Sequence, residues 1–526
     1  MRILYKIANK LFRIVKKILK LLTSRMVIIG VALLLEFCWL AGIVMQLNEK
    51  SVYINYAVTI LSLIAVLSII NNPKMNPGYK LMWAVCILAL PVTGICLYGI
   101  LGHSSVARKF RTHYDTVLLS QGGVLGEEEE TRKKLEEENI LAAGQSSYLT
   151  NYAHYPVYEN TETEYYPLGD VWFEHFIEEL KKAEHYIFME YFIISEGYLW
   201  DTVLEILKEK AAAGVDVRVI YDDFGCVTTL PYQYYKSLQQ MGIKCAAFNQ
   251  FRPVLNVILN NRDHRKIAVI DGHTAFTGGI NLADEYINRK ERFGHWKDSG
   301  ICLHGEAVWS FTVMFLQMWS TITGMECDFE SYRPEIYHKE AFKKDGFVQP
   351  YGDSPLDGET VGEHVYLNII SQAKKYLYIF TPYLIPDNET LTALCMAAKR
   401  GVDVRIVTPG IPDKKIVYIL TQANYEILLE SGVQIYQYTP GFIHSKSFVC
   451  DDEVATVGTI NMDYRSMYLH FECGVWMYGS SAVAQVKEDA LTTFEQCEQI
   501  NMDYCRKKNF AVRALRGALK FLAPLL

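Results

Sequence analysis

The sequence repeats one spaced pattern, first as HRKIAVIDGHTAFTGGIN at residues 264–281 and again as HSKSFVCDDEVATVGTIN at residues 444–461. Five residue types recur at equal intervals in the two copies: His264, Lys266, Asp271, Gly278 and Asn281 in the first, and His444, Lys446, Asp451, Gly458 and Asn461 in the second. Two complete copies are far less expected by chance than one. The repetition predicts one active site built from two similar halves.

The first half of each copy is rich in β-branched and apolar residues, which favours a strand. Because side chains alternate along a strand, His264 and Lys266 are expected on one face and Arg265 on the other. The second copy follows the same rule.

The aspartates differ from the histidines and lysines in strand parity. Asp271 and Asp451 belong to the catalytic motif, but each is expected to brace its own lobe. The glycines allow close backbone approach, which would bring Asn281 and Asn461 within reach of a substrate.

The surrounding sequence predicts an α/β fold with two homologous lobes, at residues 151–340 and 341–505. Helical and strand patterns alternate at 170–184, 186–194, 200–213 and 215–221, and the order recurs at 376–385, 390–399 and 402–407. The phrase GVDVR at 214–218 reappears at 401–405. A polar segment with three prolines, 328–357, is interpreted as the connection between the lobes.

Membrane patterns occupy both ends of the chain. Residues 1–25 alternate basic and apolar residues, as in an interfacial helix. Residues 26–102 are predicted to span the membrane, with apolar stretches at 26–47 (which includes Glu36), 52–70 and 81–101. Bases flank both ends of this block, so we expect two true spans, a shallow or re-entrant third stretch and cytoplasmic lobes. Residues 103–150 are read as a polar linker, and the basic, apolar segment 506–526 as a membrane-docking element.

The net charge and the cysteine pattern limit the kinds of binding partner and site that are expected. The net charge of −7 gives no global attraction to nucleic acid. The twelve cysteines include no CxxC pair, which favours free thiols in a reducing compartment over a disulfide framework or a zinc site.

A pair of histidines and a pair of lysines suit a phosphodiester substrate. The lysines and the asparagine amides can stabilise the phosphoryl oxygens. One imidazole can attack phosphorus and the other can transfer the proton of the alcohol. An alternative is a zinc or manganese site made of two histidines and two aspartates, but a lysine beside each histidine would repel a cation.

These motifs resemble the phospholipase D superfamily, whose two His-Lys-Asp motifs form one active site. The flanking phrases NRDHRK at 261–266, FTGGIN at 276–281, DEY at 284–286, VGTINMD at 457–463 and RS at 465–466 look like those of bacterial cardiolipin synthases. The resemblance covers about residues 50–526, since it also includes the N-terminal apolar hairpin.

The resemblance implies an enzyme of the bacterial plasma membrane with several membrane spans. It would be a phosphatidyltransferase that joins two phosphatidylglycerol molecules into cardiolipin and releases glycerol, with no cofactor or metal. His264 would be the nucleophile and His444 the general acid and base, although near symmetry allows the reverse. Asp298 and Glu472 are candidates to orient these histidines.

Several alternatives stay open at this point. Water as the acceptor would make the protein a phospholipase D, serine would make it a phosphatidylserine synthase, and DNA would make it a nuclease. The membrane block and the negative charge count against a nuclease. A catalytically inactive membrane scaffold is a further alternative, disfavoured because both motifs are complete.

Overall fold

The structure is a computed structural model that describes residues 25–44, 49–73, 75–101, 105–120, 123–126, 129–250, 261–506 and 510–525. It divides into two units, Met1–Lys109 with Arg252–Leu259, and Phe110–Phe251 with Asn260–Leu526. The amphipathic helix expected at residues 1–25 lies outside the described residues except for Arg25.

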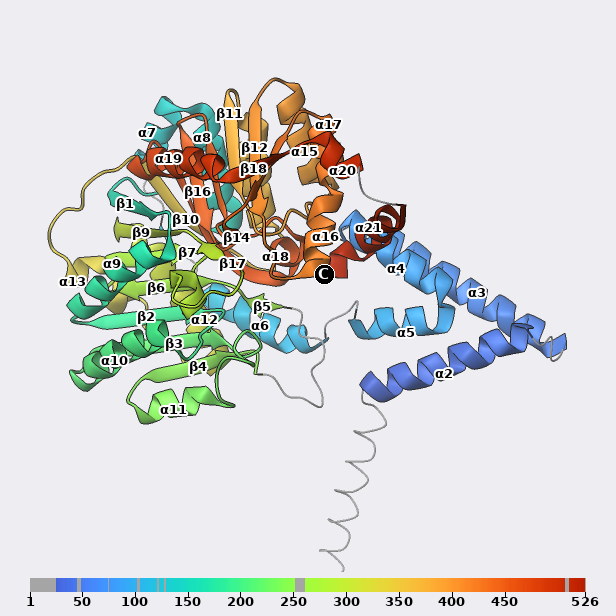
Figure 1. The fold of residues 1–526 in the computed structure, drawn as a ribbon. Helices are drawn as coiled ribbons and strands as arrows, with labels where there is room; N and C mark the ends of the chain where they lie inside the picture. Colours follow the sequence, from blue (N-terminus) through green and yellow to red (C-terminus); the bar gives the residue numbers. More distant parts are fainter. Residues whose placement is uncertain are drawn as a thin grey trace, which may run out of the picture. The chain divides into compact units, whose positions relative to one another are not determined.

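The first unit consists of the apolar helices α2 (Arg25–Val44), α3 (Glu49–Ile70), α4 (Pro77–Ala89) and α5 (Pro91–Leu101) (Figure 1). Among the described residues, one stretch is long and apolar enough to cross a membrane, Val52–Ile70 within α3, with a mean hydropathy of 2.1. This finding supports membrane anchoring by one helix and corrects the expectation of several spans. The stretch expected at 81–101 is broken at Leu90, because Pro91 begins a new helix.

The second unit contains two large sheets, drawn mainly in green and mainly in orange and red (Figure 1). The first has the order β1-β9-β7-β6-β2-β3-β4, and the second has the order β10-β17-β16-β15-β11-β12-β13-β18. Apart from β18, the two orders match strand for strand, so the predicted duplication of an α/β lobe is confirmed. The first sheet comprises β1 (Thr161–Tyr166), β2 (Tyr186–Tyr191), β3 (Asp216–Asp222), β4 (Lys244–Phe248), β6 (Lys266–Ile270), β7 (Thr274–Gly278) and β9 (Gly300–Gly305). The second comprises β10 (Phe347–Asp353), β11 (Tyr376–Phe380), β12 (Asp403–Pro409), β13 (Gln434–Tyr438), β15 (Ser447–Cys450), β16 (Val454–Gly458), β17 (His470–Tyr478) and β18 (Cys497–Ile500).

Helices cover the sheets and bury their apolar faces. On the first sheet, Ile187 and Met189 of β2 pack into a core with α9, α10 and α11, while Phe188 stacks on Phe315 of α12 at 4.7 Å between ring centroids. This alternation is the two-residue period of a strand that is buried on both faces. The helices of the first lobe are α9 (Gly169–Lys182), α10 (Tyr198–Ala212), α11 (Tyr234–Gln240) and α12 (Val308–Thr323). Those of the second lobe are α14 (Val361–Gln372), α15 (Asn388–Lys399), α16 (Lys415–Ala423), α17 (Tyr425–Glu430), α18 (Tyr464–Leu469) and α19 (Ser481–Glu495).

Two segments differ from the sequence-based interpretation. Residues 103–150 form the helices α6 (Ser105–Ser120), α7 (Glu129–Glu138) and α8 (Ile140–Tyr148) instead of a polar linker, and α8 is packed, since Gln349 Nε2 donates to Ser146 O at 3.2 Å. The proposed connection at 328–357 contains β10. Pro350 fits there because β10 is at the edge of its sheet and pairs along its length only with β17.

Short strands are exchanged between the lobes. β5 (Arg262–Asp263) of the first lobe pairs with β17 of the second, and β14 (Gly441–Ile443) of the second lobe pairs with β8 (His295–Lys297) of the first. A motif histidine follows each exchanged strand, and its backbone N–H donates to the other lobe: His264 N to Phe471 O at 2.9 Å, and His444 N to Lys297 O at 2.7 Å. The exchange therefore fixes both histidines at the interface between the lobes.

Candidate active site

Each motif histidine is hydrogen-bonded to an acid of the opposite lobe. His264 Nδ1 lies 2.9 Å from both carboxylate oxygens of Glu472, and His444 Nδ1 lies 2.6 Å from Asp298 Oδ2. All four side chains are buried. Because Nδ1 is engaged in each ring, Nε2 is the nitrogen left for chemistry.

The two acids are held in their charged form. Burial alone would raise the pKa of Glu472, but the charge and hydrogen bond of His264 hold it well below its usual range. Thr459 Oγ1 and Ser466 Oγ also donate to this carboxylate, at 2.5 and 2.6 Å. Burial likewise opposes the ionisation of Asp298, and His444 and Lys446 outweigh it, so the pKa of Asp298 is lowered.

The pKa values of the imidazoles and the lysines are lowered as well, which for these groups favours the neutral form. Burial lowers the pKa of His264 well below its usual value, and burial together with Lys446 lowers the pKa of His444 to about 4. Both rings are therefore neutral near pH 7, and each keeps a lone pair for attack or proton transfer. Burial also lowers the pKa of Lys266 to about 8 and that of Lys446 to about 7.

The lysines lie beside the histidines, as the predicted shared faces require. Lys266 Nζ donates to the carbonyl oxygen of His264 at 2.5 Å, and Lys446 Nζ donates to that of His444 and lies 2.8 Å from its Nδ1. Arg265 points away, as expected, and forms an ion pair with Glu190 at 2.5 Å.

The motif aspartates serve the fold. Asp271 accepts hydrogen bonds from the backbone N–H groups of Glu184, His185 and Tyr186 at 2.7–2.8 Å, and Asp451 accepts those of Lys374, Lys375 and Tyr376 at 2.6–2.8 Å. Neither aspartate lines the cavity that the histidines line. Each aspartate therefore holds a backbone turn of its own lobe, and its part in the catalytic set stays a prediction.

The glycines and asparagines are less symmetric than the motif. A Cβ on Gly278 would lie 2.4 Å from Ser299 O, and one on Gly458 would lie 2.5 Å from Cys473 O, so both glycines permit close strand packing. The Asn281 amide is occupied, because Oδ1 accepts from Ile193 N at 3.0 Å and Nδ2 donates to Tyr286 Oη at 2.7 Å. Asn461 Oδ1 is buried without a hydrogen-bond partner and lines the cavity.

Comparison with known proteins assigns the family. A family model described as "Cardiolipin synthase, PLD-like domain" matches residues 176–319 and 366–493, and one described as "Phospholipase_D-nuclease N-terminal" matches residues 60–103. The chain belongs to the cardiolipin synthase-like family of the phospholipase D superfamily. The chain is therefore a phospholipase D-like phosphatidyltransferase.

Individual relatives agree with this assignment. An uncharacterized protein of Streptococcus mutans serotype c is 43% identical over 88% of this chain and 99% of its own length. A cardiolipin synthase of Alkalihalophilus pseudofirmus is 34% identical over 89% of this chain and 92% of its own length. The crystal structure of a phosphatidylserine synthase from Haemophilus influenzae shares the fold, with a TM-score of 0.54 at 16% identity, over 73% of this chain and 100% of that one.

The cavity at the lobe interface has a volume of about 410 Å³ and is lined by residues of both lobes, including both motif histidines. No role was predicted from the sequence for Arg262, Trp296, Arg465 and His470, all of which line this cavity. A positional signal was present for two of them, because Trp296 and His470 each precede an orienting acid by two residues.

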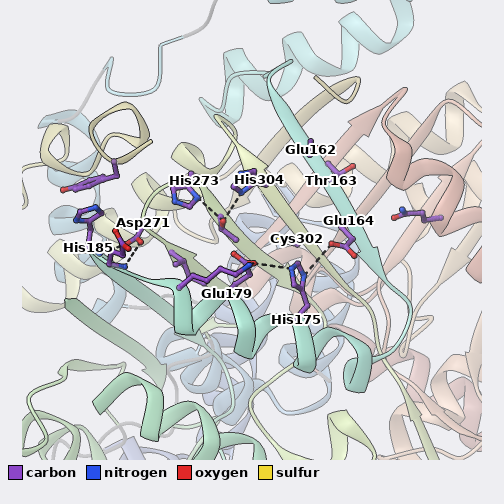
Figure 2. Close-up of a pocket in the computed structure, with 16 residues that line it drawn as sticks. Glu162, Thr163, Glu164, His175, Glu179, His185, Asp271, His273, Cys302 and His304 are labelled. Atoms are coloured by element: carbon purple, nitrogen blue, oxygen red, sulfur yellow. Dashed lines mark hydrogen bonds and ion pairs between the residues drawn. The ribbon is translucent and has the colours of Figure 1, made fainter. Parts of the chain in front are cut away.

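A larger cavity, of about 690 Å³, lies at the far end of β6, where Asp271 ends the strand (Figure 2). It contains no motif histidine or lysine. Its His175 lies between Glu164 and Glu179, at 3.6 and 3.4 Å (Figure 2). Both motif histidines therefore line the smaller cavity and not this one.

The alternative metal site of two histidines and two aspartates does not assemble, because backbone amides occupy both aspartates. Within the described residues, His264, His470 and Glu472 place ligand atoms within 4.8 Å of one another, as do Glu363, Asp387 and Glu389. Lys266 lies next to the first group, and a lysine there disfavours a bound cation.

Proposed function

We propose that this protein is a membrane-anchored cardiolipin synthase. It transfers the phosphatidyl group of one phosphatidylglycerol to a second one and releases glycerol. The observation that carries the proposal is the pair of crossed contacts, His264 with Glu472 and His444 with Asp298, beside one cavity. Two oriented neutral imidazoles supply the nucleophile and the proton carrier that a two-step transfer needs.

In the first step, Nε2 of one histidine attacks phosphorus and the bond from phosphorus to the glycerol oxygen breaks. The second histidine takes up a proton at Nε2 when the anionic phosphate binds beside it, and it gives that proton to the leaving glycerol. By analogy with the family, His264 attacks and His444 carries the proton, and the near symmetry of the contacts is compatible with the reverse. In the second step, a hydroxyl of the acceptor lipid gives its proton to the proton carrier. Its oxygen attacks phosphorus, and the bond from phosphorus to nitrogen breaks.

The residues around the histidines supply the charge stabilisation. Lys266 and Lys446 provide positive charge for the phosphoryl oxygens, and Asn461, which lines the cavity, can donate a hydrogen bond to them from Nδ2. With these groups in place, the chemistry requires no metal ion and no cofactor.

Membrane attachment brings the lobes to their substrate. We place the enzyme in the bacterial plasma membrane, anchored by α3, with its lobes in the cytoplasm. The break at Leu90 supports a re-entrant third stretch. A protease-accessibility assay on sealed vesicles tests the orientation, and an external C-terminus would contradict it.

The C-terminal helix α21 (Phe510–Leu522) supports docking on an anionic membrane surface. Leu519 and Ala523 pack against Leu420 of α16, while Leu515 is 47% exposed. Lys414 and Val417, at the start of α16, line the active-site cavity, so α21 lies beside the entrance that a lipid would use.

The central test incubates the detergent-solubilised protein with phosphatidylglycerol and resolves the products. Cardiolipin together with free glycerol is the expected result. Phosphatidic acid as the only lipid product would show a hydrolase and overturn the proposal.

A further inference from the structure

The two halves of the active site differ where the repeat is otherwise regular. Beside His444 stand two apolar rings, Trp296 and Phe442, at 5.6 and 5.7 Å between ring centroids. The equivalent positions on the other side carry His470 and Arg262. His470 lies 5.4 Å from His264 between ring centroids. At these two positions, therefore, the half with His444 carries aromatic rings and the half with His264 carries basic side chains.

His470 has the properties of a group that awaits a ligand. Its side chain is 10% exposed, it lines the cavity, and both ring nitrogens are buried without a hydrogen-bond partner. The nearest acid is Glu472, at 3.5 Å, and that carboxylate is already engaged by His264, Thr459 and Ser466. Buried polar groups are normally hydrogen-bonded, so the imidazole indicates a missing partner in the cavity.

Arg262 also has a buried side-chain nitrogen without a hydrogen-bond partner. Its guanidinium stacks over Phe224 at 4.1 Å, its Nε is buried without a partner, and among the described residues no carboxylate forms an ion pair with it. Burial lowers the pKa of Arg262, the charge of Asp222 partly opposes this, and the like charge of Arg465, which lines the same cavity, adds to it. Two arginines that repel one another at a cavity wall favour an anion between them.

The acids near this basic group are occupied elsewhere. Asp222 accepts hydrogen bonds from the backbone N–H groups of Phe224, Gly225 and Asp263 at 2.8–3.1 Å. Asp463 caps α18 by accepting from the backbone N–H groups of Arg465 and Ser466 at 2.9 and 3.1 Å. The Nε of Arg262 and both ring nitrogens of His470 are thus left for a ligand.

We propose that Arg262, Arg465 and His470 form a second anion subsite, which binds the phosphate of an anionic acceptor lipid while the donor phosphate lies between the two motif histidines. This inference rests on the proposed function and names its acceptor class. A phosphatidylglycerol acceptor carries its own phosphate, three carbons from the hydroxyl that attacks, so it needs a phosphate site beside the reaction centre. Water and serine carry no phosphate and would not use this site.

The experiment compares two soluble acceptors that differ by the phosphate. The full-length protein in detergent micelles receives a low concentration of acyl-labelled phosphatidylglycerol as the donor. The acceptor is either glycerophosphoglycerol or isotope-labelled glycerol, and both transfer products are quantified. The wild-type protein should prefer glycerophosphoglycerol. Arg262→Gln should reduce that preference by about 10-fold or more, the loss expected for a charge-assisted hydrogen bond. His470→Phe should reduce it as well.

Arg289→Gln is the matched control, because Arg289 is exposed, stacks over Tyr198 and does not line the cavity. It removes the same charge and should leave the preference unchanged. Transfer to glycerol in each variant reports that the protein is folded and that the histidine chemistry is intact.

Two results would overturn the subsite. One is an unchanged acceptor preference in Arg262→Gln, and the other is an equal loss of both transfer reactions, which would place the arginine on the donor phosphate. A wild-type protein that prefers glycerophosphoglycerol but makes no cardiolipin from phosphatidylglycerol would instead support the subsite and contradict the proposed function.

Discussion

Replacing Glu472 by glutamine tests whether the crossed contact sets the state of its histidine. The carboxylate is fully buried and accepts from His264 Nδ1, Thr459 Oγ1 and Ser466 Oγ at 2.5–2.9 Å. A glutamine keeps the shape but replaces one acceptor oxygen by an NH₂ donor. If that NH₂ faces the ring, Nδ1 must become an acceptor, and the proton moves to Nε2, where the reacting lone pair is needed.

The size of the effect follows from this change of tautomer. Loss of an orienting partner costs about 10- to 100-fold, and a wrong tautomer in a catalytic histidine costs about 10⁴-fold, so we expect a fall in kcat of about 10² to 10⁴. This corresponds to about 3 to 5 kcal/mol in the activation barrier. The assay measures glycerol release from phosphatidylglycerol micelles, with cardiolipin quantified in parallel.

Glu498→Gln, which makes the same chemical change at an exposed position of β18, is the control and should keep the wild-type rate. Thermal unfolding of both variants separates a catalytic loss from a folding defect. A folded Glu472→Gln protein that retains more than a third of the wild-type rate would refute the orienting role.

Four further predictions follow from the site. His264→Ala and His444→Ala should each abolish cardiolipin formation, and substantial turnover in either would contradict a shared site. Asp451→Ala leaves three backbone N–H groups unpaired and should lower the free energy of unfolding by about 2–4 kcal/mol, measured by urea unfolding. An unchanged urea midpoint would show that the aspartate does not stabilise the fold. The pKa values of Lys266 and Lys446 are lowered to about 8 and about 7, so kcat/KM should fall as pH rises through this range and the lysines lose their charge. Lys446→Arg should move this fall to higher pH. A pH profile of Lys446→Arg identical to that of the wild type would exclude Lys446 as its cause. EDTA should leave the rate of transfer nearly unchanged, whereas strong inhibition reversed by added metal would restore the metal-site alternative.

The lobes could be predicted from the sequence because local hydrophobic patterns indicate most of their helices and strands. The helix expected at 170–184 is α9, Gly169–Lys182, and the strand expected at 402–407 is β12, Asp403–Pro409. The strand expected from His264 onward fails at its start. Arg262 and Asp263 pair with β17 of the other lobe, and β6 begins only at Lys266. A partner some 200 residues away leaves no local trace, so periodicity cannot reveal it.

The site was predictable as far as the two copies agree. The histidines and lysines share positions in both copies, so they could be named from the repeat. Asp298 and Glu472 stand at different distances from their histidines and were named from the family resemblance. Which acid meets which histidine is a tertiary fact that spacing does not encode. The repeat assigned no role to Arg262 and His470, because the other copy has Phe442 and Trp296 at the equivalent positions. A search for repeated residues overlooks those that differ.

The exchange of β5 and β14 makes each lobe incomplete alone, because its histidine lacks the acid partner that only the other lobe provides. A single-lobe ancestor with this exchange would have worked only as a two-fold dimer, in which both halves of the site were necessarily identical. Joining two copies in one chain removes that constraint. A tethered pair can assign one half to the molecule that gives and the other to the molecule that receives, which a self-associating lobe cannot do.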